Sequence, residues 1–137
     1  MAKITYIHEG QASNTARLIV DGKYIDSENF VGLVDNNIHA IQWNGSSGEI
    51  EYKDNTPNKT ISDISSYDFE KKFTDEEKVI ADAETKAEAD RKAAMTYADK
   101  RIEEYPSIQD QLDDIYHNGI DGWKSTIEAV KDKYPKG

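Results

Sequence analysis

Histidines, the side chains most often used as metal ligands or general bases, are scattered along this chain. His8, His39 and His117 lie on unlike segments, and none has a second histidine at helical or strand spacing. We interpret His39 as an ordinary strand residue and His117 as a favourable cation near the end of a helix. The histidines therefore predict no metal site and no general base.

The densest acidic cluster is a second candidate for chemistry. It comprises Asp110, Asp113 and Asp114 together with Glu103 and Glu104. A divalent cation could bind carboxylates, but a calcium loop of alternating acids around a glycine is missing here. We interpret these acids as helix-start and solvated-face residues, and we expect no metal and no cofactor.

Nucleophiles and phosphate-binding loops have as little support. The segment WNGSSGE, residues 43–49, has no lysine and is followed by a strand pattern rather than a helix, so it predicts a hairpin loop. Ser46, Ser47 and Ser107 have no histidine and acid partners at a recognisable spacing. The chain has no cysteine, which excludes thiolate chemistry and disulfides. We expect a protein that is not an enzyme and takes no small-molecule ligand.

The composition favours association. Hydrophobic residues make up 36% of the 137 residues and charged residues 32%, so little apolar surface is available to bury. We therefore expect an elongated protein or a homo-oligomer. The net charge of −10, with basic residues spread out, would repel a phosphate backbone, so no nucleic-acid partner is expected.

Targeting signals are missing from the sequence as given. The start, MAKITYIHEG, lacks the apolar run of a signal peptide, and no apolar stretch reaches about 18 residues. We expect no membrane contact and synthesis in the cytoplasm.

The elements that carry these residues change type along the chain. In residues 1–73, Asp21-Gly22 predicts a type I′ hairpin turn. From residue 38, Ile38, Ala40 and Gln42 alternate with His39, Ile41 and Trp43, which is typical of a strand. We predict strands over residues 4–7, 16–20, 23–26, 31–34, 38–43 and 49–53, and one irregular strand within 54–68. They would form a small antiparallel sheet or a half-open barrel.

Residues 74–105 predict one long charged helix. Thr74 and Glu77 match a capping box, and residues 75–104 contain no glycine or proline, which gives a rod of roughly 45 Å. The helix either supports the sheet within one chain or pairs with a second copy. The oligomer stripe that we predict is Ile80, Ala83, Ala87, Ala94, Ala98 and Ile102.

Residues 106–137 predict two short helices that fold against each other. Pro106 ends the long helix, Ser107 caps the next one, Gly119 closes it and Asp121-Gly122 opens the last. Such a small core contributes only a few kcal/mol, so this module should dock onto another protein. The predicted docking face is Tyr105, Leu112, Ile115, Tyr116, Trp123, Ile127 and Tyr134. The alternative is that these residues are the module's own core.

The expected fold class is therefore α+β. A small N-terminal antiparallel β domain, residues 1–73, is followed by one long α-helix, residues 74–105, and by a short C-terminal helical hairpin, residues 106–137.

Two stretches carry a resemblance. The segment YPSIQDQLDDIYHNGIDGWKSTIEAVKDKYPKG, residues 105–137, resembles the C-termini of small proteins of tailed bacteriophages, and IHAIQWNGSSGEIEY, residues 38–52, looks like the β region of such proteins. Members of this group look like virion structural, tail-fibre or tail-assembly proteins. The resemblance implies an assembly role, other phage structural proteins as partners, and a location in the tail region of the virion after synthesis in the host cytoplasm.

Three functions stay open at this point. The first is a structural or interaction protein of the phage tail or tail fibre. The second is a tail or fibre assembly chaperone that is not retained in the particle. The third is a small enzyme or carbohydrate-binding module that uses Trp43, Tyr52 and the acids of the sheet.

Overall fold

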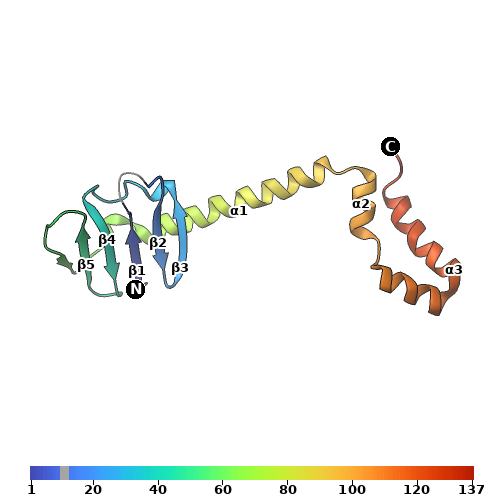
Figure 1. Ribbon diagram of the computed structural model, residues 1–137, viewed down its shortest axis with the longest axis horizontal. Coiled ribbons are helices and arrows are strands. Elements are labelled where there is room, and N and C mark those ends of the chain that lie inside the picture. The colour runs from blue at the N-terminus through green and yellow to red at the C-terminus, as the bar shows by residue number, and fades with distance from the viewer. Residues whose placement is uncertain (10–12) are drawn as a thin grey trace. The chain divides into compact units, whose positions relative to one another are not determined.

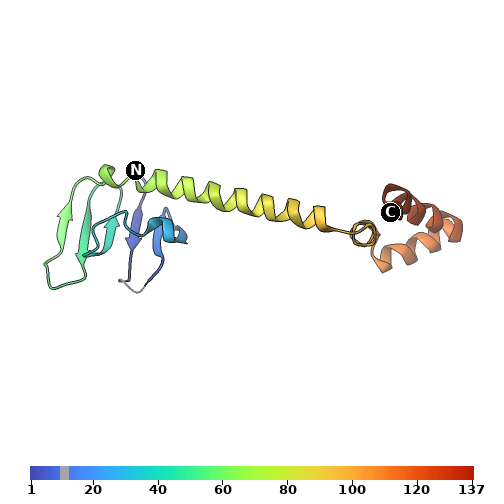
Figure 2. The same ribbon diagram turned by 90° about the horizontal axis from the view of Figure 1, so that it is seen from above.

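The computed structural model describes residues 1–9 and 13–137. The chain divides into two compact units, residues 1–84 and residues 85–137. The described strands all belong to the first unit, while the second is helical (Figures 1 and 2). A sheet followed by helices confirms the predicted α+β class.

The sheet is antiparallel throughout. Its order is β3-β2-β1-β4-β5-β6, so β1 and β4 lie at its centre. Within the described part of the first unit, the elements before the long helix are β1 (Ile4–Ile7), β2 (Ala16–Val20), β3 (Lys23–Ser27), the 3-10 helix η1 (Glu28–Phe30), β4 (Ile38–Trp43), β5 (Gly48–Tyr52), β6 (Lys59–Ile61) and the 3-10 helix η2 (Ser65–Tyr67).

The turn between β2 and β3 has the predicted geometry. Asp21 and Gly22 have φ angles of 48° and 86°, and Val20 pairs with Lys23 across the turn. Two successive positive φ angles define the type I′ hairpin, which matches the twist of the strands that it joins.

One predicted strand is missing, and one predicted alternation is wrong. Residues 31–34 form no strand, because η1 precedes them and Gly32 takes a φ of 84°, which ends any extended run. In β4 the strict alternation fails, since the pairing register with β5 shifts between Ile38 and Ala40. This irregularity lets Ile38 join Ile41 in the core, although the two would otherwise face opposite sides of the sheet.

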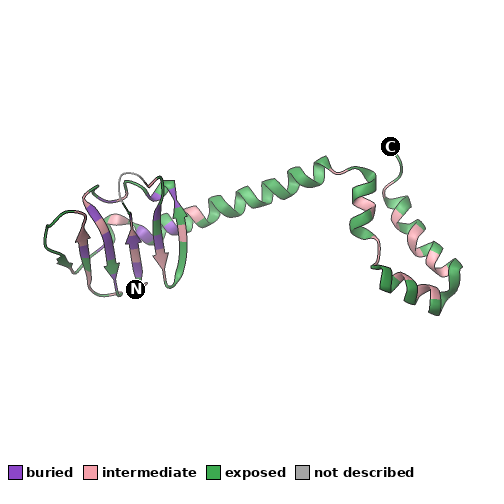
Figure 3. Cartoon of the chain, viewed as in Figure 1, coloured by how far each residue is buried: buried purple, intermediate pink, exposed green. Residues whose placement is uncertain are grey.

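The core lies between the sheet and the first turns of α1 (Phe69–Ala94) (Figure 3). The ring of Phe69 stacks on Tyr6, with centroids 5.6 Å apart, and the hydroxyl of Tyr6 donates to the carbonyl oxygen of Phe30 at 3.2 Å. Burial raises the pKa of Tyr6, so the phenol stays a donor. The largest fully buried side chains are Tyr6, Phe30, Phe69, Leu18 and Ile41.

One carboxylate ties α1 to η1. Glu76 accepts from the hydroxyl of Ser27 at 2.7 Å through Oε1 and from the side-chain amide of Asn29 at 2.9 Å through Oε2. Ser27 is itself buried and accepts from the backbone N–H of Asn29, so the start of η1 and the second turn of α1 share one hydrogen-bonded network.

The predicted start of the long helix at Thr74 is wrong. The helix begins at Phe69, and the hydroxyl of Thr74 donates back to the carbonyl oxygen of Glu70 at 3.0 Å instead of capping. The earlier start sets Phe69 and Phe73, four residues apart, on one face over the sheet. The expected boundary between residues 73 and 74 therefore falls inside α1.

The single helix predicted over residues 75–104 is also wrong. α1 ends at Ala94, and α2 (Tyr97–Glu104) begins after Met95 and Thr96. Thr96 has extended backbone and accepts from the N–H of Asp99, while the carboxylate of Asp99 accepts from the N–H of Thr96. This reciprocal capping box starts a new helix inside a sequence of strong helix formers.

The last helix is α3 (Ile108–Lys133), which Gly119 interrupts. Gly119 has φ 74° and ψ 178°, so it forms a corner between two helical halves (Figure 1). Ser107 accepts from the N–H of Asp110 at 3.1 Å and caps the first half. The prediction of two helices that meet near Gly119 is confirmed.

The anchoring of α1 on the sheet can be tested at Phe73. We expect Phe73→Ala to lower the free energy of unfolding of the first unit by about 3–5 kcal/mol, because it opens a cavity under the sheet. Chemical denaturation followed by Trp43 fluorescence in a Trp123→Phe background would measure this. The matched control is Val79→Ala, an exposed residue of the same helix, which should cost less than about 1 kcal/mol. Equal losses in both variants would contradict the anchoring.

Candidate functional site

Burial is divided unequally between the two units. Every buried residue among those described lies between Ile4 and Phe73, and residues 85–137 include none (Figure 3). The second unit is therefore held by half-buried contacts, and its surface carries the apolar side chains that a core would otherwise bury.

The two halves of α3 are joined by side-chain hydrogen bonds across the corner. The indole Nε1 of Trp123 donates to Oε1 of Gln111 at 3.0 Å, and the hydroxyl of Thr126 donates to Oδ2 of Asp114 at 2.9 Å. Asn118 donates to the other oxygen of Asp114 at 2.7 Å. The hydrogen bond from Asn118, and after it that from Thr126, holds the pKa of Asp114 below its ordinary value, because each stabilises the ionised carboxylate.

The end of the chain is fastened to α2. Arg101 donates to the carbonyl oxygens of Tyr134 at 2.8 Å and Lys131 at 3.2 Å, through Nε and Nη2 respectively. Glu104 accepts from the ammonium of Lys133 and the hydroxyl of Tyr134, each at 2.5 Å. These groups lower the pKa of Glu104, Lys133 being the larger cause. Hydrogen bonds and an ion pair therefore hold α2 against the last turn of α3, in a unit where no described residue is fully buried.

The predicted docking face separates into two groups. Five of its residues are half-buried within the second unit, and Leu112 and Tyr116 are exposed on the first half of α3. The half-buried positions fit the alternative that these residues are the module's own core, and the docking of Leu112 and Tyr116 stays a prediction. The half-buried group is Tyr105, Ile115, Trp123, Ile127 and Tyr134.

Two exposed large apolar residues of α3, Ile108 and Ile120, do not belong to the predicted face. Ile108 lies four residues before Leu112, and this helical spacing was a signal that could have placed it there. Ile120 lies just beyond the Gly119 corner, where helical periodicity does not continue. Its exposure could not have been read from the sequence pattern.

The predicted oligomer stripe is not continuous. The break at Met95 and Thr96 leaves Ala94 at the end of α1 and places Ala98 and Ile102 on α2, so the six residues do not lie along one helix. All six are exposed: Ile80, Ala83, Ala87, Ala94, Ala98 and Ile102.

Two of the histidines are neighbours: the backbone N–H of His8 donates to the carbonyl oxygen of His39 at 2.9 Å, whereas His117 belongs to the second unit. His8 is buried, with Nδ1 3.1 Å from Nζ of Lys53 and Nε2 3.4 Å from the carbonyl oxygen of Ser13. His39 is half-buried in β4, and His117 is exposed, 3.4 Å from Asp113 one turn earlier. These contacts are those of ordinary polar side chains.

The acidic cluster is divided among separate partners. Glu103 pairs with Arg91 at 2.7 Å, whereas Glu104 pairs with Lys133. Asp110 accepts from the hydroxyl of Ser107 at 2.7 Å. Over residues 1–9 and 13–137, no group of three or more histidine or acidic side chains is arranged to hold a metal ion.

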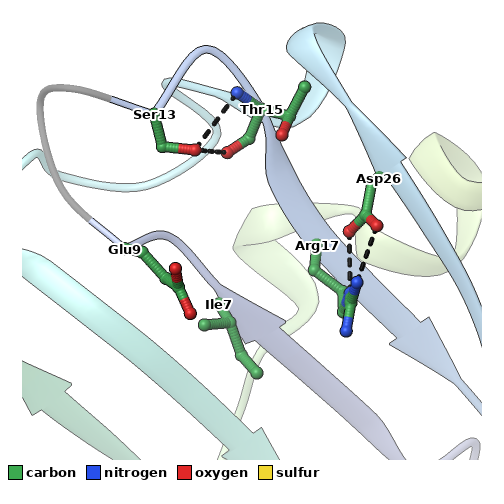
Figure 4. Close-up of a pocket in the computed structure, with 6 residues that line it drawn as sticks. All are labelled: Ile7, Glu9, Ser13, Thr15, Arg17 and Asp26. Atoms are coloured by element: carbon green, nitrogen blue, oxygen red, sulfur yellow. Dashed lines mark hydrogen bonds and ion pairs between the residues drawn. The ribbon is translucent and has the colours of Figure 1, made fainter.

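A polar hollow lies beside β1, β2 and β3 (Figure 4). Its cation, Arg17, makes two hydrogen bonds of 2.7 Å to Asp26, and the guanidinium lies over the ring of Tyr24. The Asp26 carboxylate thus already neutralises Arg17, which lowers the pKa of Asp26. The hollow is lined by Ile7, Glu9, Ser13, Thr15, Arg17 and Asp26.

The aromatic platform required by a carbohydrate-binding module is not available at the predicted residues. Trp43 is only 5% exposed and belongs to the core, and Tyr52 is half-buried against that core. A sugar ring stacks on an open aromatic face, which Trp43 does not offer.

No helix in the described part of the chain is long and apolar enough to span a membrane. Comparison with protein-family models, curated proteins and solved structures found no match to this chain.

The closure of α3 can be tested through Asp114. We expect Thr126→Val to raise the pKa of Asp114 towards its ordinary value, because one hydrogen bond to the carboxylate is lost. Since the folded pKa is lowered, this bond stabilises the hairpin above about pH 4, and the stabilisation disappears as the pH falls through the folded pKa. Carboxyl carbon shifts in an NMR titration would measure the change.

The control for this titration is Ser125→Ala. Ser125 donates to the carbonyl oxygen of Asp121 and not to Asp114, so its removal should leave the titration of Asp114 in place. An identical Asp114 titration in wild type and Thr126→Val would show that the two halves of α3 do not meet at this bond.

Proposed function

We propose that this protein is a structural or interaction component of a tailed-phage particle, in the tail or its fibres, that acts by docking to other particle proteins. The resemblance of residues 105–137 to small phage proteins supports the setting. The observation that carries the docking role is the second unit, in which no described residue is buried and several large apolar side chains are exposed.

The two units are suited to different tasks in this proposal. The sheet unit has its own core, closed by Phe69 and Phe73, and needs no partner to bury it. The helical unit has half-buried contacts and polar clasps, so association with another protein would bury the apolar surface that it exposes. We propose that the protein acts by binding and not by turnover.

Self-association is the second part of the expected partnership. The exposed residues Ile80 and Ile102 lie on α1 and α2. Each could contribute to a contact between copies, but the break at Met95 and Thr96 excludes the continuous helical seam that the sequence predicted.

The particle setting can be tested directly. Quantitative mass spectrometry of purified particles of the phage that encodes the chain should find it at a fixed copy number relative to known tail proteins. Persistence after high-salt washing would separate a bound component from a contaminant. A chain that is abundant in infected cells but missing from particles would contradict the structural role and favour the transient assembly chaperone.

A further inference from the structure

The first half of α3 carries an apolar stripe on its exposed side. Ile108, Leu112 and Tyr116, here named the outer stripe, follow one another at intervals of four residues and are 76%, 62% and 84% exposed. Residues at this spacing lie along one face of a helix. Gln111 and Asp114 bind the second half of α3 instead, so the outer stripe lies on a face that the hairpin does not cover.

The charges around the outer stripe have one sign. Residues 102–123 contain no lysine or arginine, and their acids are Glu103, Glu104, Asp110, Asp113, Asp114 and Asp121. Arg91 pairs with Glu103 and Lys133 pairs with Glu104, and both of these glutamates lie on α2, outside α3. On α3 itself, Asp110 accepts from the hydroxyl of Ser107, and Asp113 lies near His117. Among the ion pairs of the described residues, none joins Asp110 or Asp113 to a lysine or an arginine. The outer stripe therefore has an acidic border.

A second copy of this chain is a poor match for such a surface. If the outer stripes of two copies packed against each other, their acidic borders would also meet. Like charges repel strongly in a partly desolvated contact, so this pairing is unfavourable. The other half of α3 has lysines, including Lys124 and Lys131, but apart from Ile120 its large apolar residues are half-buried. Beyond Ile120, the described chain exposes no large apolar side chain, so that half offers charge without an apolar counterpart.

We propose that the outer stripe binds an amphipathic helix of another protein whose apolar stripe is flanked by lysine or arginine. This inference rests on the proposed docking function and names the chemistry of the partner. Apolar contact with Leu112 and Tyr116 supplies the burial, and basic flanks face Asp110 and Asp113. The basic flanks select the partner and its orientation, because like-charged helices are repelled.

Two synthetic helical peptides test this assignment. Each has about 18 residues and the same leucine stripe, but one has lysine flanks and the other has glutamate flanks. Fluorescence anisotropy with the full chain should show at least about tenfold tighter binding of the lysine-flanked peptide. At high salt the difference in affinity between the two peptides should become smaller, because salt screens the charge–charge attraction. The lysine-flanked peptide should still bind, because salt does not screen the apolar contact.

Variants separate the outer stripe from general attraction to an acidic protein. We expect the double variant Leu112→Ser, Tyr116→Ser to bind the lysine-flanked peptide about tenfold more weakly, or weaker still. Its helicity, measured by circular dichroism, should be retained because both side chains are exposed. The matched control is Ile102→Ser, an exposed residue of α2, which should bind as wild type does. Asp113→Asn should reduce the preference for lysine flanks over glutamate flanks.

Three results would overturn the assignment. The first is equal affinity for the two peptides. The second is that the Leu112→Ser, Tyr116→Ser double variant and Ile102→Ser weaken binding of the lysine-flanked peptide equally, which would indicate charge attraction alone. The third is a dimer in sedimentation that the stripe variant dissociates, which would assign the outer stripe to a second copy. A chain found at fixed copy number in particles that binds neither peptide would overturn this partner chemistry and leave the proposed function in place.

Discussion

The structure depends on two phenylalanines from the first turns of α1. Phe69 and Phe73 close the face of a six-stranded sheet that would otherwise be open to water, and Glu76 fixes the same turns to η1. A lone sheet layer cannot bury a face by itself, so the fold requires this helix. After Phe73 no further described residue is fully buried, so the fully buried core ends about halfway along the sequence.

The second unit is organised on a different principle. Its closures are directional: the indole of Trp123 to Gln111, Thr126 to Asp114, and Arg101 to the carbonyl oxygens of the last turn. Each such bond contributes on the order of 1 kcal/mol net, and those near the surface less. Hydrogen bonds of this kind define a shape without supplying the free energy that a buried core provides. A shape defined in this way is suited to association, where the partner contributes the missing burial.

Local rules predicted much of this architecture, and their failures have physical causes. The Asp21-Gly22 turn, five of the strands and the Gly119 interruption follow from residue type and spacing. The helix starts before the capping signal at Thr74 because tertiary burial of Phe69 outweighs that signal. The break before α2 was missed because Thr96 uses an aspartate in its capping box, within a run that favours helix throughout.

The candidate site was predicted in part for similar reasons. Periodicity identified Leu112 and Ile115 together with Trp123 and Ile127, but it could not say which of them face inward. That depends on the corner, which rotates the second half of α3 so that Trp123 meets Gln111. The local excess of acid around the outer stripe is visible in the sequence, yet it becomes informative only when the exposed face is known.

The Gly119 corner also fixes which face of the second half of α3 is turned towards the first half. No connecting loop separates them, and Gly122 lies so near Asn118 that a Cβ there would be 2.5 Å from that side chain. Since each added helical residue turns the chain by about 100°, one insertion would swing Trp123 and Thr126 away from their acceptors. Related chains that keep this hairpin should therefore vary in length elsewhere and conserve the spacing from Gln111 to Trp123.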